Sequence, residues 1–173
     1  MAEKKENPMR EIIIDKVTVN MGVGEPGEPL EKAKKLLETL SESTAVETKA
    51  RDRNPTFKLR KGLPIGVKTT LRGEGAADFL AKALAAKKKI LKESNFDSRG
   101  NFSFGVREYI DFPGAKYDPT IGMLGFDVCV TLIRRGERVK RRILKTSKVG
   151  NAHLLKKEDG IEFAKSRFDV TVE

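Results

Sequence analysis

The sequence predicts an α+β fold in which helices pack on one face of an antiparallel sheet and leave the other face free. The first observation is the order of elements: one strand, a helix, two strands, a helix and two strands. Paired strands favour antiparallel hairpins over a parallel, doubly wound sheet. The second observation is that two strands alternate apolar with polar residues, as strands do when one side is solvated. At 173 residues, we expect a single domain, 1–173.

The first half of the chain contains three predicted strands and one helix. Residues Ile12 to Gly24 are β-branched and partly alternating, which predicts a strand that runs into a turn rich in glycine and proline. Apolar residues then recur at helical spacing from Leu30 to Leu40, so an amphipathic helix should end near Ser41 to Ser43. A short strand is expected at Ala45 to Lys49, and an amphipathic strand at Ile65 to Arg72.

The second half begins with a predicted helix from Gly73 to about Lys92, whose lysine-rich tail suits the negative end of a helix dipole. Two strands should follow, separated by a loop that contains prolines. The chain should then end with a helix and a last strand. In order, these four elements are Asn101 to Arg107, Phe126 to Ile133, Lys157 to Lys165 and Phe168 to Val172.

Charge indicates a polyanionic partner. Lysine and arginine number 35 against 25 acidic residues, which gives a formal charge of +10 and a pI near 9.7. Nucleic acid is the leading candidate and an anionic membrane the second. No apolar run approaches the roughly 18 residues that span a bilayer, and the N-terminus is polar. We therefore expect a soluble, intracellular protein with a flexible N-terminus at residues 1–9.

Two segments carry positive charge almost alone, whereas solvated surfaces usually mix both signs. Between Lys49 and Arg72, eight cations stand against Asp52, and nearby prolines and glycines favour a stiff, projecting loop at residues 51–64. Between Arg134 and Lys148, eight cations stand against Glu137. The alternative for the second segment is a helix face whose long side chains cover the core.

The alternation of the amphipathic strands predicts one polar surface. In the first strand, Val17, Val19 and Met21 point one way, and the strand ending at Arg72 repeats the pattern. If the two strands are neighbours, donors and acceptors suited to phosphates and ribose hydroxyls gather on the free face. This predicted RNA-binding surface comprises Lys16, Thr18, Asn20, Lys68, Thr70 and Arg72.

Three other motifs give weaker signals. Gly22, Gly24 and Gly27 match a dinucleotide-binding pattern, but Glu25, Glu28 and Glu31 would put carboxylates beside the pyrophosphate, so we expect no cofactor. Phe102 and Phe104 faintly resemble an RNA-stacking strand, yet their shared parity favours packing. The single Cys129 and His153 allow neither a disulfide nor a zinc site within the chain; we expect Cys129 to be packed and the protein not to be an enzyme.

Five sequence blocks resemble the ribosomal large-subunit protein five family. They run in the expected order between about Arg10 and Ile133, while the short N-terminus and basic C-terminal third look archaeal. The blocks are Lys16-Val-Thr-Val-Asn-Met-Gly-Val-Gly-Glu25, Thr48-Lys-Ala-Arg51, Phe57-Lys-Leu-Arg-Lys-Gly-Leu-Pro-Ile-Gly66, Thr70-Leu-Arg-Gly73 and Phe96-Asp-Ser-Arg-Gly-Asn-Phe-Ser-Phe-Gly105.

The resemblance implies a cytoplasmic protein in the central protuberance of the large subunit, with a sheet face that binds 5S rRNA. Its partners would be 5S rRNA, 23S rRNA, peptidyl-site tRNA, a second 5S-binding ribosomal protein and a small-subunit head protein. At Ser43, bacterial relatives often carry a glutamine that joins the RNA contact, and serine reaches less far. By position, the resemblance implies 5S rRNA contacts at Asn20, Thr70 and Arg72. Together with the alternation of the strands, the full set of expected 5S rRNA contacts is Lys16, Thr18, Asn20, Thr48, Lys68, Thr70 and Arg72.

The resemblance also implies that the basic loop, Arg51 to Leu63, reaches toward the tRNA, through Arg51, Arg53, Asn54, Lys58, Arg60 and Lys61. The second basic segment is expected to contact other rRNA or protein, through Arg134, Arg135, Arg138, Arg141 and Arg142. Two other classes use the same features. One is a free-standing RNA-binding regulator or chaperone, and the other is a nucleotide-dependent enzyme built on the glycine-rich turn.

Overall fold

The computed structural model describes residues 7–119 and 121–173. Its main sheet has five strands in the order β2-β3-β1-β6-β5, and every neighbouring pair is antiparallel. The α+β class and the antiparallel pairing are therefore confirmed. The strands are β1 (Ile12–Gly22), β2 (Val46–Lys49), β3 (Pro64–Leu71), β5 (Phe102–Val106) and β6 (Phe126–Arg134).

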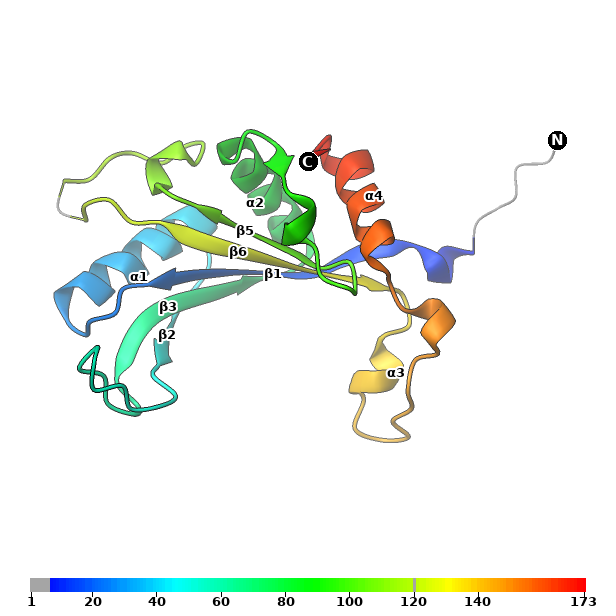
Figure 1. Ribbon diagram of the computed structural model, residues 1–173, viewed down its shortest axis with the longest axis horizontal. Helices are drawn as coiled ribbons and strands as arrows, with labels where there is room; N and C mark the ends of the chain where they lie inside the picture. The colour runs from blue at the N-terminus through cyan, green and yellow to red at the C-terminus, as the bar shows by residue number, and fades with distance from the viewer. Residues whose placement is uncertain (1–6, 120) are drawn as a thin grey trace.

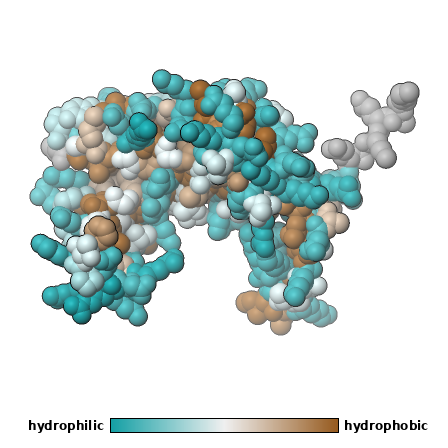
Figure 2. All heavy atoms as spheres, in the orientation of Figure 1, coloured by the Kyte–Doolittle hydropathy of each residue, from teal (hydrophilic) through white to brown (hydrophobic). Residues whose placement is uncertain are grey.

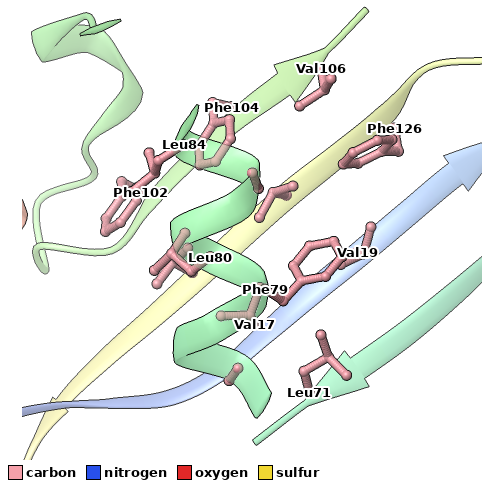
Figure 3. Close-up of a cluster of buried hydrophobic side chains, with 14 of the residues drawn as sticks. Val17, Val19, Leu71, Phe79, Leu80, Leu84, Phe102, Phe104, Val106 and Phe126 are labelled. Atoms are coloured by element: carbon pink, nitrogen blue, oxygen red, sulfur yellow. The ribbon is translucent and has the colours of Figure 1, made fainter. Parts of the chain in front are cut away.

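Helices α1 (Glu28–Ser41) and α2 (Gly73–Ala86) cover one face of this sheet (Figure 1). The apolar side of β1 is completely buried beneath them, with Val17 and Val19 at 0% exposure. In Figure 3, Phe79 and Leu80 of α2 lie over the sheet near Val17 and Val19, and Phe126 of β6 belongs to the same cluster. Among the described residues, no helix lies on the other face of the sheet (Figure 1), as the alternating strands predicted.

The predicted end of the second helix is wrong. Helix α2 stops at Ala86, because Lys88 and Lys89 both adopt left-handed backbone conformations with φ near 57° and reverse the chain. The reversal buries Leu91 in a short strand, β4 (Ile90–Leu91), which pairs in parallel with β7 (Thr171–Val172). The lysine run is thus the capping turn at the C-terminus of α2, where Lys87 is the C-cap and the Lys89 amide donates to the Leu84 carbonyl oxygen at 2.9 Å. The last strand is shorter than expected.

The C-terminal third returns to the body of the molecule through α4 (Lys157–Phe168). This helix packs so closely on the turn before β5 that two glycines meet. A Cβ atom on Gly100 would lie 2.8 Å from the Lys156 carbonyl oxygen, and one on Gly160 would overlap the Gly100 backbone. Only glycines permit this approach, which also buries Phe163 and Ala164 against the core.

The remaining elements are short. Helix α3 (Arg138–Arg141) follows β6, and single 3-10 turns lie at Pro8–Arg10, Glu93–Asn95, Tyr109–Asp111 and Asn151–His153. The flexible N-terminus predicted at residues 1–9 falls mostly outside the described residues. Within the described part of the chain, no helix combines the length and the apolar content needed to cross a membrane.

Candidate nucleic-acid interface

Strands β1 and β3 are direct neighbours, which brings together the polar residues of both. Thr18 lies opposite Thr70, and Asn20 lies opposite Lys68. Residues opposite one another in a sheet point to the same face. Because Lys68 and Thr70 are exposed while the alternate residues Val67 and Thr69 are buried, that face is the uncovered one.

The same face continues onto the neighbouring strands. Thr48 of β2 lies opposite Gly66, where a Cβ atom would lie 2.9 Å from the Thr48 Oγ1 atom, so a glycine here leaves room for the threonine side chain. On the other side, Asn20 lies opposite Asp127, and Thr18 lies opposite Cys129. The face is therefore cationic and hydroxyl-rich over β3 and β1, and it carries a carboxylate over β6.

The expectation that Cys129 is packed in the core is wrong. Its neighbours Val128 and Val130 are buried, but Cys129 alternates with them and lies exposed on the free face. The run of apolar residues concealed this alternation. Partial burial, followed by the nearby Asp127 carboxylate, raises the pKa of the Cys129 thiol, so the thiol is not poised as a nucleophile.

A β-bulge in β1 places an acid on this otherwise cationic half of the face. The pairing with β6 shifts between Ile14 and Lys16, so Asp15 is the extra residue. Its carboxylate, only 8% exposed, accepts two hydrogen bonds from Arg141 at 2.9 and 2.8 Å. Arg72 donates from Nη1 to the same carboxylate and to the Asp15 carbonyl oxygen, each at 3.2 Å.

These contacts explain the acidity of Asp15. The hydrogen bonds from Arg141 are the main cause that lowers the pKa of the Asp15 carboxyl from its usual 3.8, with further lowering by the charges of Arg141, Arg72 and Lys16. Partial burial opposes them. Arg72 is therefore on the free side of the sheet but already has an acidic partner, which its alternation alone did not indicate.

The β2–β3 loop, residues 50–63, extends the hairpin away from the sheet (Figure 1). Backbone hydrogen bonds close it: the Ala50 amide donates to Leu63 at 2.8 Å, and Asn54 and Leu59 exchange bonds at 3.1 and 2.9 Å. The Asn54 side chain accepts from the Thr56 amide, so its oxygen supports the turn. Among the described residues, no acid pairs with the exposed cations of this loop, Arg51, Arg53, Lys58, Arg60 and Lys61.

The second basic segment forms the C-terminal arm, which we define as residues 135–148, following Arg134 at the end of β6. Arg134 is largely buried and pairs with Asp159 at 3.2 Å, while Arg135 pairs with Glu11 at 2.8 Å. Arg138 and Arg142 are exposed and have no acid partner among the described residues. The alternative of a helix covering the core does not apply, because α3 has no buried residue.

The loop and the arm project from the same side of the molecule. Figure 2 shows them as two separate extensions of the body, with an opening between them, and Figure 1 places the sheet above that opening and the helices beyond it. The uncovered face is therefore flanked by two basic projections.

Comparison with known proteins shows the family to which the chain belongs. A model of ribosomal protein L5 matches residues 7–60, and a model of the C-terminus of the ribosomal L5 family matches residues 64–163. The chain belongs to the ribosomal protein L5 family. This is a family of structural ribosomal proteins and not of enzymes, which confirms the resemblance and the non-enzymatic expectation.

Archaeal members of the L5 family are similar to the chain over nearly its full length. Large ribosomal subunit protein uL5 of Methanococcus vannielii is 51% identical over 171 residues, which are 97% of this chain and 94% of that protein. The protein of the same name from Sulfolobus acidocaldarius is 48% identical over 169 residues, 98% and 95% of the two chains. The protein of that name from Methanoregula boonei is 47% identical over 164 residues, which are 95% of this chain and 99% of that protein.

The glycine-rich turn has a structural role in this L5 family member. The amides of Val23 and Gly24 both donate to the Ile65 carbonyl oxygen, at 3.0 and 2.8 Å, so they close β1 onto β3 and do not point toward a ligand. Elsewhere, the His153 Nε2 atom lies 2.8 Å from the Arg135 carbonyl oxygen, at the base of the arm. Within residues 7–119 and 121–173, no cluster of metal-ligating side chains occurs.

Sequence reasoning missed Asp15. The signal that could have found it is local: three isoleucines, Ile12 to Ile14, precede an aspartate in a strand whose alternation begins only at Lys16. A strand that starts with consecutive apolar residues and then changes its alternation indicates a bulge.

Proposed function

We propose that this chain is a structural protein of the large ribosomal subunit that binds 5S rRNA with the uncovered face of its sheet. The observation that carries the proposal is the adjacency of Thr18, Asn20, Lys68 and Thr70 on a face that no helix covers. Lysine neutralises phosphates, while hydroxyl and amide groups bond to ribose and phosphate oxygens. The L5 family and the large-subunit relatives support a ribosomal RNA as the ligand.

The proposed contact set is Lys16, Thr18, Asn20, Thr48, Lys68, Thr70 and Arg72. Arg72 can serve although it pairs with Asp15, because the contact to Asp15 uses Nη1 alone. A guanidinium has five N–H donors, so Nη2 and Nε can still donate to a phosphate. In this arrangement Asp15 holds Arg72 in place before RNA arrives, which reduces the conformational entropy lost on binding.

We further propose a division of labour between the two projections. The β2–β3 loop reaches peptidyl-site tRNA through Arg51, Arg53, Lys58, Arg60 and Lys61, with Asn54 shaping the turn. The C-terminal arm contacts 23S rRNA or a neighbouring protein through Arg138 and Arg142. Residues 1–173 then act as one rRNA-binding domain in the central protuberance, next to a second 5S-binding protein and a small-subunit head protein.

A salt titration with matched lysine variants tests the sheet face. In filter binding of the full chain to 5S rRNA, raising salt from 50 to 200 mM should weaken binding by about 10³ for roughly six neutralised phosphates. Lys68→Gln should reduce the slope of log affinity against log salt by about one. Lys82→Gln is the control, because Lys82 is exposed on α2, on the covered side. Equal slopes for both variants would contradict the proposal.

Arginine variants test the geometry of the same contact. Arg72→Ala should cost about 1 to 3 kcal/mol in 5S rRNA binding, and Arg72→Lys should recover only part, since an ammonium cannot donate two parallel hydrogen bonds to a phosphate. Thermal melting controls for folding. If the Arg72→Ala variant binds 5S rRNA as tightly as the unaltered protein, Arg72 is not part of the contact.

Sedimentation of the cellular pool separates this function from that of a free-standing RNA-binding regulator. A ribosomal protein co-migrates with large subunits in a sucrose gradient. A pool that stays mostly at the top of the gradient would favour the regulator.

A further inference from the structure

The tip of the C-terminal arm exposes two large aliphatic side chains. Ile143 is 96% exposed and Leu144 is 80% exposed. Both follow α3 at the far end of the arm, and Figure 2 shows a hydrophobic patch at the end of this largely hydrophilic projection. Their high exposure distinguishes them from the partly buried apolar residues that pack against the core.

The tip is surrounded by cations that no acid neutralises among the described residues. Arg135, Lys140 and Arg141 of the arm pair with Glu11, Glu137 and Asp15. Within the part of the chain that the structure describes, the four other cations of the arm have no acid partner: Arg138, Arg142, Lys145 and Lys148. All four are exposed.

Hydrogen bonds within the arm hold the tip in a defined shape. The Arg142 Nε atom donates to the Lys145 carbonyl oxygen at 2.8 Å, and the Thr146 hydroxyl donates to the Arg142 carbonyl oxygen at 2.7 Å. The Ser147 amide closes the loop on Val139 at 3.2 Å. With Arg141 bound to Asp15 on the sheet, the tip residues are presented on a loop whose two ends are connected.

We propose that the arm is a second RNA-binding site, separate from the sheet face, in which Ile143 and Leu144 pack against an unstacked base or a ribose of ribosomal RNA. In proteins that bind DNA, apolar side chains beside cationic residues insert between base steps, and we infer an analogous packing on RNA here. The four cations without an acid partner among the described residues supply the phosphate contacts. Charge complementarity favours RNA over a protein partner, because +4 of uncompensated charge surrounds the two aliphatic residues. The inference rests on the proposed function, which takes rRNA as the ligand and assigns Arg138 and Arg142 of the arm to 23S rRNA or a neighbouring protein, and it adds the two aliphatic residues of the tip.

The test measures affinity of the full chain for two probes, 5S rRNA and protein-free large-subunit rRNA. The double variant Ile143→Ser with Leu144→Ser should bind one of the two about tenfold more weakly, with the salt slope unchanged, because only apolar burial is lost. Lys145→Asn with Lys148→Gln should instead reduce the slope by about two. Asparagine tolerates the left-handed backbone at Lys145, where φ is 53°.

Met123→Ser is the matched control, because Met123 is 61% exposed in the loop before β6 and away from the arm. Its affinity for both probes should equal that of the unaltered protein. An Ile143→Ser and Leu144→Ser variant that keeps full affinity for both RNAs overturns the inference; if it also fails to enter large subunits, the tip contacts a protein. If the unaltered protein bound neither RNA, the proposed function itself would be refuted.

Discussion

The β2–β3 loop and the C-terminal arm flank the same sheet face, but different interactions hold them. Backbone hydrogen bonds between its two strands close the loop, and among the described residues its cations have no acidic partner. The arm is joined to the body mainly by side-chain ion pairs to Glu11 and Asp15. A basic projection can thus keep its shape through the backbone and leave every charge available, or use some of its charges to hold its position.

The largest expected effect concerns α4, which follows the arm in the chain and packs on the turn before β5. Gly160→Ala should lower the free energy of unfolding by about 3 kcal/mol, because its Cβ atom would overlap the Gly100 backbone in a packed region. Urea denaturation measures this change. Gly150→Ala is the control, since nothing lies within 4 Å of its Cβ position. Equal midpoints for the two variants would show that α4 shifts at little cost.

Asp15→Asn should release the arm and leave the loop unchanged. The amide removes the charge that binds Arg141 in two places, so the free energy of opening at α3 should fall by about 2 kcal/mol. Hydrogen exchange at Arg142, whose amide donates to Arg138, reports the opening. The Ala50 and Leu59 amides of the loop should keep their protection. A parallel loss in both projections would mean that the variant unfolds globally.

Low pH should also release the arm and leave the loop unchanged, but with a smaller effect than Asp15→Asn. The pKa of Asp15 is lower in the folded chain than its usual 3.8. The carboxylate therefore stabilises the arm fully above that usual value, and this contribution is lost as the pH falls through the lower, folded value. Arm protection, corrected for intrinsic exchange rates, should fall as the pH drops below the usual value of 3.8 and through the lower pKa of the folded chain. The total effect should be smaller than that of Asp15→Asn, because the protonated carboxyl still accepts a hydrogen bond from Arg141. In Asp15→Asn, this pH dependence should be absent.

The smallest expected effect tests whether the two projections serve different ligands. Shortening the loop between Asn54 and Lys61 should leave affinity for isolated 5S rRNA within about threefold, or roughly 0.6 kcal/mol. Assembled ribosomes that carry the shortened chain should show weaker binding of peptidyl-site tRNA. Loss of 5S rRNA binding on shortening would assign the loop to the same site as the sheet face.

Alternation determined from the sequence was reliable where the two faces of a strand differ in polarity. Val17 and Val19 face the helices and Thr18 faces away, because each strand has one covered side and a one-residue shift would expose the core. The same reasoning did not identify the alternation of β6, where Cys129 stands between valines and resembles core in composition. Hydropathy alone cannot assign a face when both kinds of position hold apolar or small residues.

The sequence by itself determined the fold class, the two amphipathic strands and the two basic segments, because these depend on periodicity and charge along the chain. Only the tertiary structure decided that α2 ends before its lysines, that β4 pairs in parallel with β7, and that a bulge turns Asp15 onto the free face beside Arg72 and Arg141. The physical reason is sequence distance. Arg141 meets Asp15 across 126 residues, and a contact between residues so far apart leaves no periodic pattern near either of them.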